Sequence, residues 1–336
     1  RQRLFGILEK LVKWENSNDP EVLAAAKAEI LRSTNNNPPA LLDPFAGGGA
    51  IPLEAQRLGL EAHAHDLNPV AVMINKAMIE IPPRFAGQAP VNPDSRTRLD
   101  GATGWQGAQG LAADVQYYGE WMKREAFRRI GHLYPKVKVP HEQGGGEATV
   151  IAWIWARTVK CPNPACGCEM PLVHSFILSK KKGKEAWIEP LFENGKTAYA
   201  VHREGKPVLE GTINRKGAVC ACCGSPVGYP YIRTESVAER MGSHLMAVVA
   251  EGKNGRVYIS PDDVQILAAQ VEKPVEYPEG QLAYYPGHLN TNVYGLNEFH
   301  KLFTNRQLTA LTTFSSLVAE AQAKAEADAA AAGVVN

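Results

Sequence analysis

The chain has 336 residues, 45% of them hydrophobic, so it is long enough to bury one sizeable core and a smaller appended module. Its formal net charge of +1 gives no global argument for nucleic-acid binding, and any basic surface has to be local. No apolar run reaches the length of a membrane span and no signal peptide opens the chain, so we expect a soluble cytoplasmic protein with no membrane partner.

The first predicted elements are two helices. Apolar residues at helical spacing predict one over residues 4–14, and Asp19 followed by Pro20 predicts the N-cap and first position of the second. The next predicted elements are a strand, a helix, a strand and a helix, at residues 40–42, 50–58, 60–65 and 69–80. This succession predicts one parallel, right-handed strand–helix–strand unit of a doubly wound α/β sheet.

The rest of the chain changes character twice. Residues 81–110 are rich in Pro and Gly and are expected to form an ordered loop or a mobile lid, and residues 111–130 are predicted to form a long helix. From residue 147 to 235 the hydrophobic period approaches two and turn signals separate short runs, so this segment is predicted to be β-rich. A strand at 244–250 and a helix from Asn305 follow, and the Ala-rich end is expected to fray or to be disordered.

The stretch DPFAGGG joins the first predicted strand to its helix. Ligands of doubly wound sheets lie at the carboxyl ends of the strands, where a loop must turn sharply and let the ligand approach its backbone. Glycine permits both, because it lacks a Cβ atom and adopts positive φ. Asp43 in this stretch can accept hydrogen bonds from a ligand amine or from loop amides. Asp66 closes the next strand, where an acid can bind the two hydroxyls of a ribose.

Three ligand classes compete for such a loop. A nucleoside triphosphate site needs Lys and then Ser or Thr after the glycines, whereas Gly49 is followed by Ala-Ile-Pro. A dinucleotide site needs G-x-G-x-x-G, and no third glycine stands at that offset. S-adenosylmethionine, a nucleoside without phosphates, remains as the predicted cofactor. A glycine-rich turn with only a structural role is the alternative.

The six cysteines form two tight groups, CPNPACGC and CACCG. In each group a pair of cysteines closes a short turn ahead of a glycine, which is typical of a zinc knuckle. The predicted tetrahedral ligands of a structural Zn²⁺ are Cys161, Cys166, Cys220 and Cys223. Cys168 stays open as a substitute for Cys166, and Cys222 as a substitute for Cys220. Six free, buried thiols are the remaining alternative.

Basic residues gather in the predicted turns of the β-rich segment. They are the run SKKKGK at 179–184 and Arg203, Lys206, Arg215 and Lys216. Such side chains can engage phosphates of a nucleic acid, and a solvated surface without a ligand explains them equally well.

The stretch LLDPFAGGGAIPLEAQRLG resembles the cofactor motif of S-adenosylmethionine-dependent DNA amino-methyltransferases. From about residue 4 to 318 the chain is similar to the adenine-specific DNA methylases that carry a zinc ribbon. Further stretches with this resemblance are LVKWENSND, DLNPVAVMINKAMIEIP, YYGEWMKREAFRRIGHLYP, VKCPNPACGCEMPLVHSF and LFTNRQLTALTTFSSL. The resemblance implies a partial Rossmann-like methyltransferase fold with a β-rich zinc-ribbon insert, and it points to the same four zinc ligands.

The resemblance also implies cofactor-binding residues. The first motif contributes Asp43, Phe45, Ala46, Gly47 and Gly49. The acid after the second strand is Asp66, and Asn68 is expected near the adenine of the cofactor. The implied reaction is methyl transfer to N6 of adenine in DNA, with DNA as partner and with restriction or phage-defence proteins as further partners.

These inferences divide the chain into four segments. They are an N-terminal helical segment (1–36), an S-adenosylmethionine-binding α/β domain (37–146), a zinc-ribbon insert (147–235) and a partly helical C-terminal segment with an Ala-rich tail (236–336).

No catalytic residue is assigned. Amino-methyltransferases hold a flipped base with a polar residue, two prolines and an aromatic residue, and the stretches NPPA, IPPRF and SPDD do not fit that pattern. Because the resembled family keeps its D-P-P-Y motif downstream of the zinc insert, we expect a fragment of a longer methylase that does not methylate alone; a natural short form is the alternative. The alternative functions are RNA methylation and a non-catalytic module that binds cofactor and nucleic acid.

Overall fold

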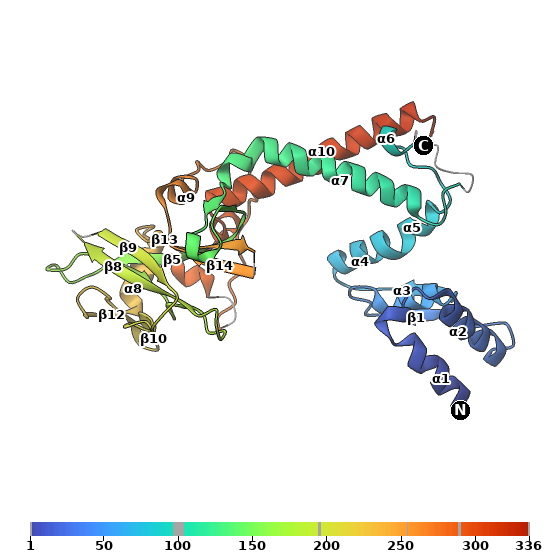
Figure 1. The fold of residues 1–336 in the computed structure, drawn as a ribbon, viewed down its shortest axis with the longest axis horizontal. Helices are drawn as coiled ribbons and strands as arrows, with labels where there is room; N and C mark the ends of the chain where they lie inside the picture. Colours follow the sequence, from blue (N-terminus) through green and yellow to red (C-terminus); the bar gives the residue numbers. More distant parts are fainter. Residues whose placement is uncertain (1, 97–103, 194–195, 254, 288–289, 335–336) are drawn as a thin grey trace. The chain divides into compact units, whose positions relative to one another are not determined.

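The computed structural model describes residues 2–96, 104–193, 196–253, 255–287 and 290–334. The chain divides into two compact units, one made of residues 1–121 with 321–336 and the other of residues 122–320 (Figure 1). The four-segment division expected from the sequence stays a prediction.

The first unit is mostly helical around a small parallel sheet. Its elements are α1 (Gln2–Leu11), η1 (Trp14–Asn16), α2 (Pro20–Ser33), β1 (Leu41–Asp43), α3 (Ala50–Arg57), β2 (Ala62–Ala64), α4 (Pro69–Asn75), the π-helix η2 (Lys76–Glu80), α5 (Ile81–Arg84) and α6 (Pro93–Arg96). The Asp19 carboxylate accepts hydrogen bonds from the amides of Glu21 and Val22, so it caps α2 as predicted.

Strands β1 and β2 are parallel, and Leu41 pairs with Ala62. The chain reaches β2 through α3, so the predicted strand–helix–strand unit is confirmed. The predicted doubly wound sheet does not appear: among the described residues β1 and β2 form a sheet of two strands. The later strands pair with one another instead, because short turns join them into antiparallel hairpins. The chain is therefore a mixed α/β protein with small sheets.

The second unit is β-rich. Its strands are β3 (Val137–Lys138), β4 (Glu147–Ala148), β5 (Val150–Lys160), β6 (Glu169–Leu172), β7 (Ile177–Ser179), β8 (Ala186–Glu193), β9 (Lys196–His202), β10 (Ile213–Asn214), β11 (Gly217–Val219), β12 (Pro226–Gly228), β13 (Gly242–Gly252) and β14 (Gly255–Ile259). Its shorter helices are η3 (Gly131–Leu133), η4 (His141–Gln143), α8 (Tyr229–Val237), α9 (Asp263–Leu267), η5 (Thr291–Tyr294) and η6 (Phe299–Leu302).

The central sheet of this unit has the order β14-β13-β5-β6, and two three-stranded sheets have the orders β7-β8-β9 and β10-β11-β12. Phe176, Ile188 and Ala247 are buried together in the core beside the central sheet. Within the predicted β-rich segment, residues 170–179 form the two strands β6 and β7 rather than one, and Val173 and Phe176 between these strands are buried in this core. Strand β5 also pairs with β13, far along the sequence.

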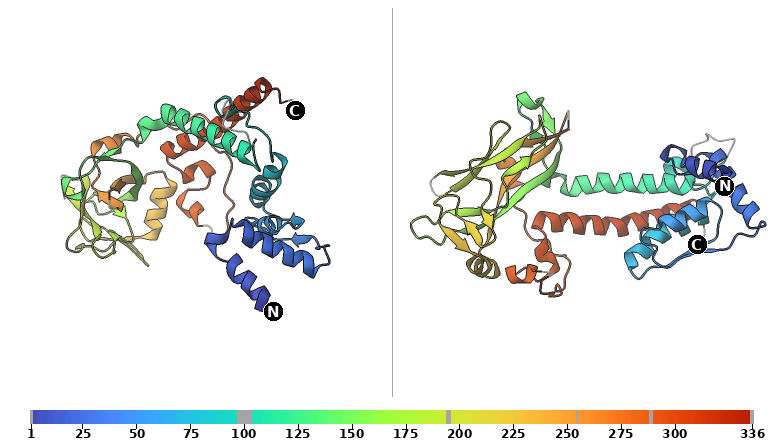
Figure 2. Two further views of the ribbon diagram at one scale, coloured as in Figure 1. Left: turned by 45° about the vertical axis from the view of Figure 1, so that its right-hand side comes forward. Right: turned by 90° about the horizontal axis from the view of Figure 1, so that it is seen from below.

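Two long helices, α7 (Gln109–Ile130) and α10 (Asn305–Ala331), lie side by side in both views of Figure 2. The Ala-rich end is helical up to Ala331 rather than disordered. Residues 97–103 of the expected loop lie outside the described residues, and the rest of that loop contains the short helices α5 and α6. No helix in the described part of the chain combines the length and the hydropathy that a membrane crossing requires.

Candidate functional sites

The glycine loop lies between the carboxyl end of β1 and the start of α3. Gly47 and Gly49 have φ values of +51° and +79°, in the left-handed region that side chains avoid. A Cβ atom on Gly49 would also lie 2.5 Å from Oδ1 of Asn75. The loop therefore needs glycine at position 49 for two independent reasons.

Two acids at the strand ends hold this loop. The amide of Phe45 donates to Oδ1 of Asp43 at 3.1 Å, so Asp43 serves a loop amide as the sequence allowed. The amide of Gly47 donates to Oδ2 of Asp66 at 2.8 Å, across the end of the parallel strand pair. Gly47 and Asp66 are separated by 19 positions in the chain, and the β1–β2 pairing brings them together.

Asp66 receives a second hydrogen bond, from the amide of Asn68 to Oδ1 at 2.7 Å. The amides of Asn68 and Gly47 hold the pKa of this carboxyl below its usual range, so Asp66 is ionised at neutral pH. An ionised carboxylate has about four lone-pair sites, and two amides leave acceptor capacity for a ligand hydroxyl.

The other predicted cofactor residues differ in exposure. Phe45 is 82% exposed, whereas Ala46 is buried and its amide donates to the carbonyl of His65 at 2.9 Å. Asn68 caps α4, because its side-chain oxygen accepts from the amide of Val70 at 3.0 Å. The structure thus gathers the seven predicted cofactor residues at one end of the strand pair, and it does not test whether they bind a cofactor.

Asn75 is a site residue that the sequence reasoning missed. It is buried, and its amide nitrogen donates to the carbonyls of Gly47 at 3.0 Å and Ala71 at 2.8 Å. Its buried Oδ1 has no hydrogen-bond partner among the described residues. The signal was present in the sequence, because an asparagine within the apolar run VAVMIN is expected to have a specific partner.

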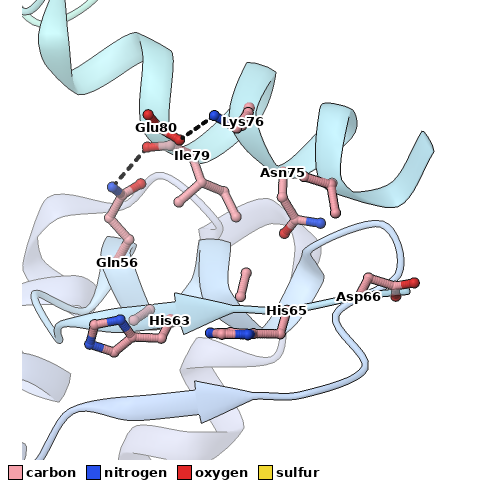
Figure 3. A pocket seen from close by; sticks show the side chains of 11 residues that line it. Gln56, His63, His65, Asp66, Asn75, Lys76, Ile79 and Glu80 are labelled. Carbon is pink, nitrogen blue, oxygen red and sulfur yellow. Dashed lines mark hydrogen bonds and ion pairs between the residues drawn. The ribbon is translucent and has the colours of Figure 1, made fainter. Parts of the chain in front are cut away.

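A cavity of about 370 Å³ adjoins this region between β2 and the helices α4 and η2 (Figure 3). Asp66, Asn75 and His65 are among the residues that line it. The amide of Gln56 donates to the carbonyl of Ile79 at 3.1 Å along its rim. The glycines of the loop do not line this cavity, but His65, Asp66 and Asn75 line it and also contact the loop.

The second candidate site is a cluster of thiols in the β-rich unit. The four predicted ligands, Cys161, Cys166, Cys220 and Cys223, have their sulfur atoms within 4.8 Å of one another. The Sγ atoms of Cys161 and Cys223 are 3.7 Å apart, and those of Cys166 and Cys220 are 3.9 Å apart. The edges of a tetrahedron with Zn–S bonds of about 2.3 Å are about 3.8 Å long. The cluster is therefore compatible with a structural zinc ion.

Two hairpins present these thiols. Cys161 follows β5 and Cys166 lies in the turn before β6, while Cys220 and Cys223 occupy the turn between β11 and β12. Each turn is closed by a backbone bond, from Cys161 N to Cys168 O at 2.8 Å and from Gly224 N to Cys220 O at 2.8 Å. Gly167 and Gly224, which follow the second predicted ligand of each turn, have φ values of +58° and +73°. Both glycines therefore adopt the left-handed conformation that the predicted tight turns require.

The thiols differ in acidity. The hydroxyl of Ser225, 3.2 Å from Cys223 Sγ, and the Ser225 amide lower the pKa of Cys223 to about 6. The Cys168 amide lowers the pKa of Cys166, whereas burial raises the pKa of Cys161 to about 12. A metal ion must therefore displace a proton from the buried thiol, while the exposed thiol of Cys223 is ionised at neutral pH.

The basic side chains lie on separate turns of the same unit. The run 179–184 joins β7 to β8, Arg203 and Lys206 follow β9, and Arg215 with Lys216 joins β10 to β11. The cationic residues among them are exposed.

Comparison of the chain with protein-family models, with curated proteins and with solved structures found no match. The fold and the sites define the class of protein. The chain is a mixed α/β protein whose β-rich region contains a four-cysteine cluster compatible with zinc. The resemblance to zinc-ribbon DNA methylases therefore rests on the sequence motifs alone.

Proposed function

We propose that the loop between β1 and α3 binds S-adenosylmethionine and that the chain belongs to a Rossmann-like DNA methyltransferase acting on N6 of adenine. The observation that carries this proposal is the 2.8 Å hydrogen bond between the Gly47 amide and Asp66. It joins the glycine turn to the acid of the neighbouring parallel strand, at the edge of a sheet where α/β proteins bind nucleosides.

The residues of the loop would act by holding the ligand in place. The glycine backbone leaves room for a close approach, and the remaining lone pairs of Asp66 would accept hydrogen bonds from the ribose hydroxyls. Asp43 lies at the end of β1, where its carboxylate would attract the ammonium group of the ligand. When bound, S-adenosylmethionine supplies an activated methyl group. The protein contributes mainly positioning for in-line attack by the adenine amine.

DNA is the proposed partner because the β-rich unit carries exposed basic turns. A zinc ion would hold together the hairpins of this unit. Lysine and arginine on exposed turns can neutralise phosphates. RNA phosphates would make the same contacts. To distinguish the two substrates, the methyltransferase to which the chain belongs is incubated with DNA and with RNA, and mass spectrometry identifies which of them is methylated.

Calorimetric titration of the zinc-loaded chain with S-adenosylmethionine and with S-adenosylhomocysteine tests cofactor binding directly. We expect both to bind, and Asp66→Ala to weaken binding by about 10-fold or more, because it removes the acceptor of the ribose hydroxyls. The control is Glu61→Gln, which removes a carboxylate beside β2 whose contact is an exposed one with His63. Equal affinities for the wild type and a folded Asp66→Ala variant would refute the role of Asp66.

A further inference from the structure

All six cysteines belong to one cluster. Beyond the four predicted ligands, the Sγ atoms of Cys168 and Cys222 lie within 4.8 Å of each other and of Cys166. Cys168 Sγ also lies 3.5 Å from Cys220 Sγ. Cys168 and Cys222 therefore lie within the thiol cluster. A zinc site with four ligands does not explain why these two cysteines are there.

The six thiols form two overlapping groups, one of four sulfur atoms and one of three, and Cys166 belongs to both. Cys166 and Cys220 contact each other at 3.9 Å, close to the edge of a zinc tetrahedron. Cys161 and Cys223 complete a first tetrahedron on this edge. Cys168 lies near both ends of this edge, because its Sγ atom is within 4.8 Å of that of Cys166 and 3.5 Å from that of Cys220. Cys222 lies within 4.8 Å of Cys166 and of Cys168.

We propose that this cluster binds two Zn²⁺ ions, with the thiolates of Cys166 and Cys220 bridging them. The first ion takes Cys161 and Cys223 as its other ligands. The second takes Cys168 and Cys222. Two dications with six thiolates carry the same net charge as one dication with four thiolates, so the second ion adds no uncompensated charge.

The structure also provides space for the second ion. A cavity of about 300 Å³ is lined by Cys166, Cys168 and Cys222, together with Phe192 and Lys196. Cys168 is 3% exposed, whereas Cys222 is exposed, so the second ion sits between the core and solvent. We therefore expect it to exchange with chelators faster than the first ion. This inference concerns the metal content and does not depend on methyl transfer.

The test is the zinc content of the full chain. Reduced, metal-free protein is loaded with excess Zn²⁺ and freed of unbound metal by gel filtration. The bound zinc is then measured by native mass spectrometry and by the zinc-to-sulfur ratio. We expect two ions in the wild type and one in Cys222→Ser, whose side chain is exposed and whose replacement does not disturb the core. Ala221→Ser, which places the same hydroxyl in the same turn without removing a thiol, is expected to keep two ions.

One ion in the wild type would overturn the proposal, and so would two ions retained by Cys222→Ser. Loading with ¹¹³Cd²⁺ tests the bridges. We expect two cadmium resonances that couple to each other through shared thiolates, and a single resonance in Cys222→Ser. Two uncoupled resonances in the wild type would overturn the assignment of Cys166 and Cys220 as bridges.

Discussion

Gly49 is the glycine of the loop at which a side chain meets the most resistance. A Cβ atom there would collide with Oδ1 of Asn75, and the φ of +79° disfavours every side chain. We expect Gly49→Ala to lower the free energy of unfolding by about 1–3 kcal/mol, measured by urea denaturation. Gly48 is the matched control, because its φ is not in the left-handed region and a Cβ atom there meets nothing within 4 Å. Equal losses in both variants would contradict this account.

At the level of single residues, the sequence predicted the N-cap of α2 and the approach of the four thiols. The roles of Asp19, Gly167 and Gly224 could be predicted from the sequence. A capping acid and a turn glycine act on their immediate neighbours in the chain, so a local pattern reveals them. The contact of Asn75 with Gly47 could not be predicted in the same way, because the two residues are 28 positions apart. A contact of that range depends on how α4 packs on the loop, and no local pattern encodes it.

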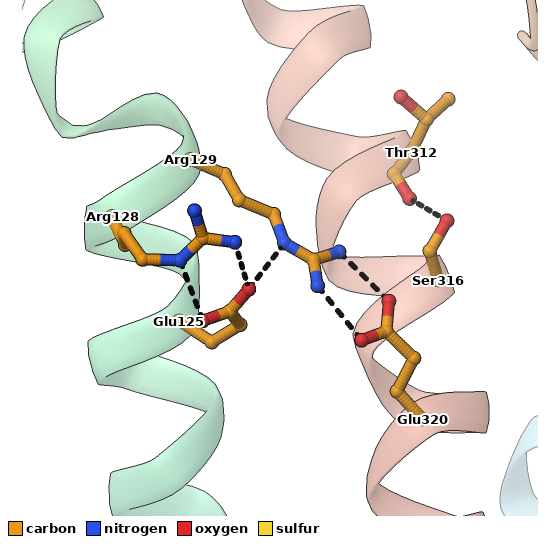
Figure 4. Close-up of polar contacts among 6 residues, drawn as sticks. All are labelled: Glu125, Arg128, Arg129, Thr312, Ser316 and Glu320. Carbon is orange, nitrogen blue, oxygen red and sulfur yellow. Dashed lines mark hydrogen bonds and ion pairs between the residues drawn. The ribbon is translucent and has the colours of Figure 1, made fainter.

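A short network of charges joins α7 to α10 (Figure 4). Arg129 makes a bidentate contact with Glu320, at 2.7 Å through each guanidinium nitrogen. Arg129 also donates to Glu125 at 2.8 Å, and Arg128 makes a second bidentate contact with Glu125. Glu125 therefore holds two arginines, one of which bridges to α10.

This network predicts a pH dependence. Arg128 and then Arg129 lower the pKa of Glu125 from its usual 4.5 to about 2, so the native state favours the ionised form. Its stabilising contribution is complete above pH 4.5 and is lost as the pH falls towards 2. We expect the difference in unfolding free energy between the wild type and Glu125→Gln to shrink across this interval. A difference that stays constant from pH 6 to pH 2 would contradict the assignment.

The sequence predicted secondary structure well where a hydrophobic period extends over many residues. It predicted secondary structure less well where tertiary packing determines which residues form a strand. The helix expected at 111–130 matches α7 within two residues, because its apolar period extends over several turns. The segment 147–235 is predicted to be β-rich from its hydrophobic period, yet of residues 207–213 only Ile213 belongs to a strand, β10. The pairing of β5 with β13 was also unreadable, since α8 and several hairpins separate the two strands in the chain.

At the scale of the whole chain, the two compact units differ in the interactions that would stabilise each of them internally. The β-rich unit contains the thiol cluster. Three of its cysteines, Cys161, Cys168 and Cys220, are part of a buried apolar core that also contains Val159, Met170 and Ile232. The other unit contains the glycine loop and no cysteine, because all six cysteines lie between residues 161 and 223.

Metal removal should therefore affect the units unequally. We expect zinc chelation to destabilise the β-rich unit by about 4 kcal/mol or more, because loss of a structural metal leaves small hairpins without their crosslink. Hydrogen–deuterium exchange should show faster exchange in β6, β11 and β12 and unchanged exchange in β1 and β2. Unchanged exchange at β11 and β12 after complete metal removal would contradict a structural role for the ion.

The central claim is that the glycine loop and Asp66 form the site for S-adenosylmethionine. Its most direct test is ultraviolet crosslinking of the labelled cofactor to the zinc-loaded chain, followed by mapping of the labelled peptides. We predict labelling within residues 41–68, with competition by S-adenosylhomocysteine and a marked loss in Asp66→Ala. Labelling confined to other peptides, or undiminished in a folded Asp66→Ala variant, would contradict the claim.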